Sequence, residues 1–177
     1  MKENKTKKAV FAGGCFWCTE SVFTGTPGVL QAISGYTGGH TPNPTYEQVS
    51  SGGTGYYEAV EVTYDPEKIT YDELLDLYWQ SIDPTDAGGQ FADRGSPYFT
   101  AIFYSDEDQQ KLATESLNKV AEKLNAKIAT KLIPADSFYS AEDYHQEYSK
   151  KNPLRYQMYK QASRRDEILN KLWHKEK

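Results

Sequence analysis

Two cysteines three residues apart, Cys15 and Cys18, are the side chains of this sequence best suited to nucleophilic and redox chemistry. Cys15 follows Gly13 and Gly14 at the predicted junction between a short buried strand (residues 9–12) and a helix. A thiol at such a junction meets unpaired backbone N–H groups and the positive end of the helix dipole, which favour the thiolate and lower the cysteine pKa. The glycines are expected to leave open space over the sulfur. We therefore interpret Cys15 as a nucleophile; a small buried hydrophobic side chain is the alternative.

The spacing of the pair, about one helical turn, is compatible with a disulfide between Cys15 and Cys18. A zinc site requires about four ligands, and the histidines of the chain are scattered (His40, His145 and His174). Haem attachment requires a histidine where Thr19 stands, and a thioredoxin-type pair usually has its tryptophan before the first cysteine, whereas Trp17 lies between the two. The remaining use is a nucleophile that becomes a sulfenic acid and is captured by its neighbour. A general dithiol oxidoreductase and a metal- or peptide-binding module stay open as alternatives.

A sulfoxide is a substrate that would oxidise Cys15 in this way. A thiolate that attacks a sulfoxide sulfur cannot expel oxide unaided, so an acid held neutral near pH 7 must protonate the departing oxygen. Glu58 is the candidate, because residues 57–64 alternate as a strand and put it on the more apolar face, where desolvation raises a carboxyl pKa. Tyrosine phenols nearby would hydrogen-bond the same oxygen, and Phe16 and Trp17 would form an apolar pocket for the methyl group. On spacing alone, a plain carboxylate at the edge of a strand is the alternative for Glu58.

Hydrophobic periodicity and turn residues predict alternating strands and helices around these side chains. Strands are expected over residues 9–12, 29–36, 57–64, 98–104 and 128–133, with irregular segments over 35–55 and 82–96. Helices are expected from residue 15, over 70–81, over 105–125 with Ser105 as cap, and over 141–150, with one helical turn at 46–49. This order predicts a single α+β domain over residues 1–177. It would be an α/β two-layer sandwich with a ferredoxin-like split βαβ core, a mixed sheet, extra C-terminal helices and long irregular segments.

The composition is typical of a soluble globular protein: 177 residues, 38% of them hydrophobic and 25% charged, with a net charge of −5. Two cysteines do not make a disulfide scaffold, and no apolar stretch is long enough for a signal peptide or a membrane span. We therefore expect a cytoplasmic monomer that binds neither membrane nor nucleic acid. From residue 150 onward, nine Lys/Arg stand against three Asp/Glu. A solvated helix that pairs with the acidic body is favoured over a nucleic-acid-binding tail.

The residues around Cys15 resemble the signature of peptide methionine sulfoxide reductase of the A type. The resemblance continues, in the order of that family, through six blocks that together are highly specific (Gly13–Glu20, Gly35–Gly39, Pro44–Tyr46, Gly55–Val60, Asp93–Tyr98 and Ala141–Tyr148). It implies reduction of the S epimer of methionine sulfoxide, in proteins and as the free amino acid, with thioredoxin as the recycling reductant. We expect no metal or other cofactor.

The resemblance also implies roles for individual residues. Cys15 would be the nucleophile, and Glu58 the acid on the sulfoxide oxygen, with Tyr46 and Tyr98 as its hydrogen-bonding companions. The implied substrate-binding residues are Phe16 and Trp17 around the methyl group and Asp93 for orientation. The predicted cycle runs through a sulfenic acid at Cys15 and a disulfide that thioredoxin reduces.

Two departures from the family pattern bear on this cycle. Many members resolve the sulfenic acid with a cysteine near the C-terminus, whereas this chain has none beyond Cys18, so Cys18 or an external thiol must do so. The family often has Thr-Gln-Tyr-Arg where this chain has Ser96–Phe99, and Pro97 removes a backbone donor and stiffens the substrate rim. His145 lies in a matching block, and we interpret it as structural support rather than as a catalytic residue.

Overall fold

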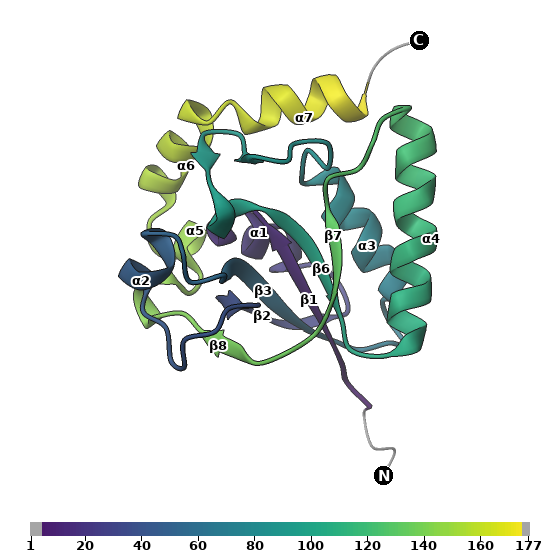
Figure 1. Ribbon diagram of the computed structural model, residues 1–177, viewed down its shortest axis with the longest axis horizontal. Helices are drawn as coiled ribbons and strands as arrows, with labels where there is room; N and C mark the ends of the chain where they lie inside the picture. The colour runs from purple at the N-terminus through teal and green to yellow at the C-terminus, as the bar shows by residue number, and fades with distance from the viewer. Residues whose placement is uncertain (1–4, 175–177) are drawn as a thin grey trace.

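The computed structural model describes residues 5–174, built around a six-stranded sheet of order β7-β6-β1-β3-β2-β8 (Figure 1). Its strands are β1 (Lys7–Gly13), β2 (Val29–Thr37), β3 (Tyr57–Tyr64), β6 (Thr100–Tyr104), β7 (Lys131–Pro134) and β8 (Phe138–Ser140). The strands β6-β1-β3-β2 pair antiparallel and β7 joins β6 in parallel, so the sheet is mixed. Helix α1 (Phe16–Phe23) links β1 to β2, and α3 (Tyr71–Gln80) follows β3. This is a ferredoxin-like split βαβ core, and the predicted α+β fold is confirmed.

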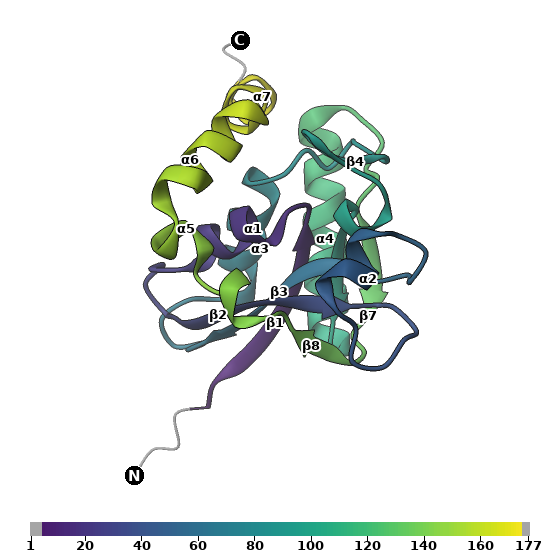
Figure 2. The same cartoon turned by 90° about the vertical axis from the view of Figure 1, so that its left-hand side faces the viewer.

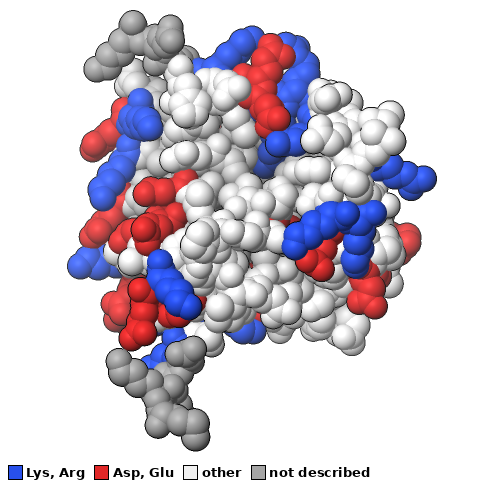
Figure 3. Space-filling view, turned by 180° about the vertical axis from the view of Figure 1, so that it is seen from behind, with Lys and Arg blue, Asp and Glu red and all other residues white. Residues whose placement is uncertain are grey.

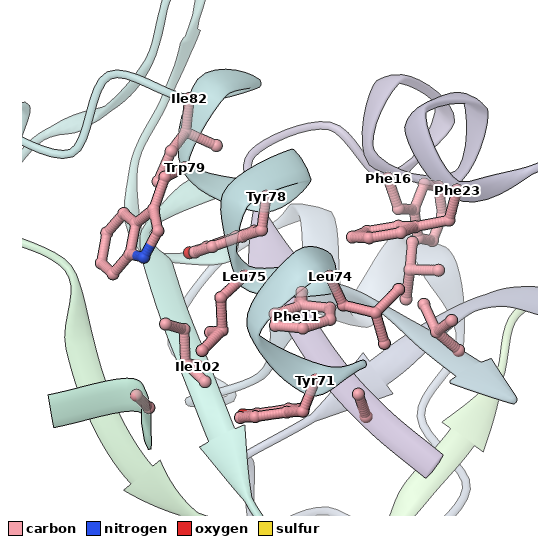
Figure 4. Close-up of a cluster of buried hydrophobic side chains, with 14 of the residues drawn as sticks. Phe11, Phe16, Phe23, Tyr71, Leu74, Leu75, Tyr78, Trp79, Ile82 and Ile102 are labelled. Carbon is pink, nitrogen blue, oxygen red and sulfur yellow. The ribbon is translucent and has the colours of Figure 1, made fainter. Parts of the chain in front are cut away.

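Helices α1, α3 and α4 (Glu107–Leu124) cover one face of the sheet (Figure 2). Helical spacing puts Leu74 and Tyr78 on the same side of α3, where both are fully buried. Phe11 of β1 stacks on Tyr78 and on Phe23 of α1, with ring centroids 5.0 Å and 5.2 Å apart (Figure 4). Burying a side chain of this size contributes about 1.5–3 kcal/mol. The strand and the helix that flank Cys15 are therefore held by one shared core.

Strand β3 turns Glu58 toward the helix-covered face of the sheet. Val60 and Val62 lie on the same face and are fully buried, whereas Tyr57 and Ala59 belong to the smaller cluster on the opposite face. Glu58 itself is only 2% exposed. The alternation predicted for residues 57–64 is thus confirmed, and it brings a carboxyl group into the layer between sheet and helices.

Several predicted boundaries differ from the structure. The N-cap of α4 is Asp106 rather than Ser105, because the Asp106 carboxylate accepts a hydrogen bond from the backbone N–H of Gln109 at 2.8 Å. The strand expected over 98–104 begins at Thr100, since the preceding residues form the 3-10 turn η1 (Ser96–Tyr98). The strand expected over 128–133 is β7, shifted toward the C-terminus.

The helix expected over residues 141–150 is wrong. This segment forms a 3-10 turn, η2 (Asp143–His145), followed by a four-residue helix, α5 (Tyr148–Lys151). Glu147, between the two, has a φ of +51°, which a right-handed helix cannot contain. Its backbone N–H donates to the buried carboxyl group of Glu20 at 3.0 Å. A tertiary hydrogen bond from α1 therefore overrides the helical pattern of the sequence.

Two small elements lie in the segments expected to be irregular. The helical turn predicted at 46–49 is α2 (Tyr46–Ser50), which starts with a capping box between Thr45 and Gln48. The other is a short hairpin of β4 (Gly89–Gln90) and β5 (Asp93–Arg94). Both elements carry residues that the sequence assigned to the site.

The extra C-terminal helices are α6 (Pro153–Ala162), at the upper left in Figure 1, and α7 (Arg165–Trp173), along the top. The expected pairing of the basic segment with an acidic body is not what these two helices show, because their ion pairs are made with acids of the same segment. Lys150, before α6, does pair with Glu147 outside the segment, and Lys175 and Lys177 lie outside the described residues. Lys160 pairs with Asp166 at 3.1 Å, and Glu167 pairs with Arg164 at 2.7 Å and with Lys171 at 2.8 Å. Figure 3 accordingly shows basic and acidic side chains side by side on the rear face.

None of the helices within residues 5–174 has the length and apolar character that crossing a membrane requires.

Candidate functional site

The turn between β1 and α1 depends on its two glycines. Gly14 has a φ of +83°, and a Cβ atom added to it would lie 2.6 Å from Cβ of Gln90. A Cβ on Gly13 would lie 2.7 Å from Oγ1 of Thr19. The expectation that the glycines leave open space over the sulfur is therefore wrong. Gly14 is needed for a left-handed turn, and both glycines are needed for close packing against neighbouring side chains.

Cys15 is the N-cap residue of α1 and is 7% exposed, so its sulfur is less accessible than the sequence suggested. Its side chain makes no capping hydrogen bond. The group that meets the helix N-terminus is Glu58, whose Oε2 accepts a hydrogen bond from the backbone N–H of Phe16 at 3.0 Å. This bond fixes the Glu58 carboxyl group of β3 next to Cys15 at the start of α1, although the two residues lie far apart in the sequence.

Glu58 is protonated to a large extent at neutral pH. Burial raises the pKa of Glu58 to about 8; the hydrogen bond from Phe16 opposes this shift, and the negative charges of Asp93 and Cys18 add to it. The apolar face of β3 predicted this direction. A neutral carboxyl group in a buried site is able to donate a proton to a group that becomes negative during a reaction.

The two thiols share one proton at neutral pH. Burial raises the pKa of Cys15 well above its usual range, and its hydrogen bond to Cys18 and the charge of Glu58 raise it further. The same hydrogen bond lowers the pKa of Cys18 to about 6 against the effect of burial, with help from Arg165 and Tyr156. The low pKa predicted for Cys15 is thus wrong. The carboxyl group of Glu58 occupies the N-terminus of α1, and the guanidinium group of Arg165 acts on Cys18.

Tyr46 of α2 and Tyr98 of η1 gather around the same two groups. Burial raises the pKa of both phenols, and the charges of Glu58 and Cys15 raise both further. Both phenols are therefore protonated donors within the electrostatic reach of the carboxyl group and the thiol. Pro97 lies in the first turn of η1, where a missing N–H removes no helical hydrogen bond.

Asp93 and the indole of Trp17 are both in contact with the C-terminal helix α6. The phenol of Tyr159 in α6 donates a hydrogen bond to Oδ2 of Asp93. The ring of Tyr159 also meets the Trp17 ring edge-on, with centroids 5.8 Å apart. Helix α6 thus connects a residue of α1 with a residue of β5.

Phe16 and Trp17 have different surroundings. Phe16 is 1% exposed and packs against Tyr36 and His145, with ring centroids 5.8 Å and 5.0 Å apart. Trp17 is partly exposed; its ring stacks on Tyr148 at 3.7 Å, and its Nε1–H donates to Nδ1 of His145 at 3.0 Å. Burial lowers the pKa of His145, which is therefore a neutral acceptor that orients the indole. This agrees with a supporting rather than a catalytic role for His145.

Sequence reasoning missed the contribution of α6 and α7. Tyr156 and Tyr159 are three residues apart, so they share one face of α6 and reach Ser21 and Asp93 respectively. Arg165 is 3% exposed and reaches the β1–α1 turn. The spacing of the tyrosines was a usable signal, but the surplus of basic residues favoured a solvated helix over a buried one.

Comparison with known proteins identifies the family. The family model described as "Peptide methionine sulfoxide reductase" matches residues 7–177. The chain belongs to the peptide methionine sulfoxide reductase family. It is 54% identical over 171 residues to peptide methionine sulfoxide reductase MsrA of Bacillus licheniformis, an alignment that covers 96% of this chain and 94% of the relative.

Solved structures of this reductase family share the fold. Mxr1 from Saccharomyces cerevisiae in its reduced form superposes with a TM-score of 0.81 at 33% identity, over 85% of this chain and 87% of that one. Mxr1 in complex with Trx2 superposes with a TM-score of 0.59 at 25% identity, over 81% and 85% of the two chains. As a member of the family the chain is an oxidoreductase for methionine sulfoxide, a reaction that needs two electrons and two protons to release the oxygen as water.

Proposed function

We propose that this reductase acts on the S epimer of methionine sulfoxide, in proteins and as the free amino acid, through a sulfenic acid at Cys15. Cys18 then forms a disulfide with Cys15, and thioredoxin reduces it. The observation that carries the proposal is the buried Glu58 carboxyl group, protonated at neutral pH and hydrogen-bonded to the residue that follows Cys15.

In the first step the sulfur of Cys15 attacks the sulfoxide sulfur. The reactive form is the one in which the shared proton of the thiol pair lies on Cys18, leaving a thiolate at Cys15. The attack forms an S–S bond to the substrate sulfur, and Glu58 gives its proton to the sulfoxide oxygen. The hydroxyl group then moves to the sulfur of Cys15 as the S–O bond and the new S–S bond of the substrate sulfur break. Methionine leaves with the electron pair, and Cys15, oxidised by two electrons, carries an S–OH group. Tyr46 and Tyr98 donate hydrogen bonds to the oxygen as negative charge develops on it.

The methyl group of the substrate is held by the aromatic side chains that follow the nucleophile. Trp17 supplies the partly exposed wall, kept in position by His145 and Tyr148, and Phe16 closes the inner end from the core. Asp93, fixed by Tyr159, orients the rest of the substrate. An apolar contact for the methyl group next to polar donors for the oxygen would distinguish the two epimers at sulfur, because only one of them presents methyl and oxygen to their respective sides at once.

In the second step Cys18 attacks the sulfur of the Cys15 sulfenic acid, and hydroxide leaves as water after protonation. The pair spans the first turn of α1, so the disulfide requires local unwinding at a helix start that follows two glycines. The hydrogen bond between the two thiols supports this pairing. The complex of the related Mxr1 with Trx2 supports a thioredoxin as the reductant of the disulfide.

The test is a single turnover of the reduced enzyme with each separated epimer of methionine sulfoxide, without reductant, with thiols counted before and after. One methionine per enzyme and the loss of both thiols are expected with the S epimer alone. Cys15→Ser should produce no methionine, and Cys18→Ser one methionine with no disulfide. Equal reaction of both epimers, or methionine formation by Cys15→Ser, would overturn the proposal. Light scattering of the same preparation tests the expected monomer.

A further inference from the structure

Arg165, the first residue of α7, carries a buried guanidinium group whose charge acts on Cys18. It is 3% exposed, and its Nη2 donates hydrogen bonds to the backbone carbonyl oxygens of Ser81 at 2.7 Å and Gly13 at 3.3 Å. The guanidinium carbon lies 4.7 Å from the centre of the Phe91 ring. The side chain is thus held by α3, by the turn that leads to Cys15 and by the loop before β5.

In the part of the chain that the structure describes, this buried cation has no carboxylate partner. Within residues 5–174, no Asp or Glu oxygen lies within 4 Å of Arg165; the adjacent Asp166 pairs with Lys160 instead. A guanidinium group stays protonated in proteins, and a buried charge is costly unless an opposite charge lies near it. The position of Arg165 therefore requires a negative group of another kind.

Arg165 and Cys18 both line a cavity of about 250 Å³ between α1, α3, α6 and α7. The thiolate of Cys18 is a negative group of the required kind. Cys18, Tyr156, Lys160 and Arg165 all line it, whereas Cys15 does not. In Figure 2, α6 and α7 lie over α1 on this side of the molecule. The cavity thus lies behind the pair, and it is Cys18 that faces the buried cation.

We propose that Arg165 is a positioning residue for the second step, in which its charge holds Cys18 as the thiolate that attacks the sulfenic acid. This inference rests on the proposed function of Cys18. In that step the S–S bond forms from the electron pair of the Cys18 thiolate, the S–O bond of Cys15 breaks, and hydroxide takes up a proton and leaves as water. A thiol at Cys18 would react more slowly, because the thiolate is the nucleophilic form.

The charged and titratable groups around Cys18 agree with this assignment. They are Cys15 before α1, Glu58 of β3, Tyr156, Tyr159 and Lys160 of α6, and Arg165 and Asp166 of α7. Both cations of the set lie on the C-terminal helices. The pKa of Cys18, lowered to about 6 by its hydrogen bond from Cys15 and by these cations, follows from that arrangement.

The two steps respond to Arg165 in opposite ways. The first step uses the form with the proton on Cys18, and the second uses the form with the proton removed from Cys18. Loss of the guanidinium charge disfavours the Cys18 thiolate, so it slows disulfide formation and does not slow methionine release. A general loss of packing would slow both steps at every pH.

The experiment compares Arg165→Gln, which keeps amide donors for the two carbonyls but has no charge, with Arg165→Lys, which keeps the charge. Methionine release and thiol loss are each followed in single turnovers over a range of pH. For Arg165→Gln the midpoint of disulfide formation should move upward by at least about one pH unit, which makes this step about fivefold slower near pH 6 and equal to wild type in alkali. Arg165→Lys should keep the wild-type midpoint, as should Arg164→Gln, a neighbouring exposed control paired with Glu167.

An unchanged midpoint in Arg165→Gln, or equal slowing of both steps, would overturn the inference. If that variant does not fold, Lys160→Gln replaces it: Lys160 lines the same cavity and is partly exposed. A smaller upward shift is then expected, and no shift would refute control by the cations of this cavity. If wild type itself loses no thiol pair after one turnover, the proposed resolving role of Cys18 fails instead, whatever the midpoint in the variants.

Discussion

Replacing Glu58 with Gln should increase the stability of the protein relative to wild type, by an amount that grows as the pH rises. The same change should remove most of the activity. In the folded protein burial holds the pKa of Glu58 at about 8, against 4.5 for a free carboxyl group. Between these two pH values the Glu58 carboxyl group is ionised in the unfolded chain and protonated in the folded one. The free energy of unfolding of wild type therefore falls by about 1.4 kcal/mol per pH unit relative to Glu58→Gln.

The magnitude follows from the width of that window. The stabilisation by the neutral carboxyl group is complete below pH 4.5 and is lost as the pH rises through 8. The difference in unfolding free energy between Glu58→Gln and wild type should thus grow by about 3 kcal/mol from pH 4.5 to pH 7, and by about 5 kcal/mol in total. An unpaired amide hydrogen of Gln in this buried site would cost the same free energy at every pH. It would therefore shift the difference in unfolding free energy equally at pH 4.5 and at pH 8 and leave its increase with pH unchanged.

The assay is urea unfolding of both proteins at several pH values, together with single-turnover methionine release. The amide of Gln keeps an acceptor for the N–H of Phe16 but delivers no proton, so the first step should slow by about a hundredfold or more. In wild type, ionisation of Glu58 should make the rate of methionine release decline above pH 8. The Glu58→Gln variant should not show this decline. Cys15→Ser should abolish the step altogether.

The matched control is Glu61→Gln, on the opposite face of the same strand, where the carboxylate pairs with Lys8 at 2.8 Å near the surface. Its unfolding free energy should run almost parallel to that of wild type across the pH range, because exposed ion pairs contribute little. Parallel curves for Glu58→Gln as well would mean that Glu58 ionises normally. Equal rates of methionine release for Glu58→Gln and wild type would remove its role as the acid.

Three further changes test other parts of the site. Cys18→Ser should form one methionine per enzyme and then stop even with thioredoxin present, which product counting with and without reductant checks; continued turnover would show that an external thiol resolves the sulfenic acid. Tyr46→Phe and Tyr98→Phe should each slow methionine release by about tenfold through loss of one hydrogen bond to the oxygen, and unchanged single-turnover rates would exclude that contact. Gly14→Ala should cost about 2–4 kcal/mol in urea unfolding, since the φ of +83° and the contact with Gln90 both oppose a Cβ atom; a stability within error of wild type would contradict the packing described for this turn.

The sequence predicted those features that depend on local patterns. Alternation over residues 57–64 gave the buried face of β3 and, with it, the position and raised pKa of Glu58. The strand, glycine pair and cysteine gave the β1–α1 junction with Cys15 at the helix start. These predictions succeeded because the alternation within one strand and the residues of one turn determine these features, independently of contacts with distant parts of the chain.

The features that the sequence did not predict depend on contacts between distant residues. The break in the helix expected over 141–150 comes from the hydrogen bond between Glu147 and Glu20. The sequence predicts a lowered pKa for Cys15, whereas the structure lowers that of Cys18. The reason is that the carboxyl group of Glu58 from β3 occupies the N-terminus of α1, and the guanidinium group of Arg165 from α7 acts on Cys18. No pattern within α1 indicates either partner.

The two chemical steps require opposite protonation states, and the fold supplies them on two sides of one helical turn. Release of the sulfoxide oxygen needs a proton, and Glu58 lies in a buried place where the charges that act on it from the described residues, those of Asp93 and Cys18, are negative. Capture of the sulfenic acid needs a thiolate, so Cys18 faces the two cations of α6 and α7. If both thiols and the carboxyl group shared a single environment, any field that favoured the acid would disfavour the thiolate. Separation by the first turn of α1 removes that conflict, and it gives the C-terminal helices a chemical reason to be packed against the catalytic core.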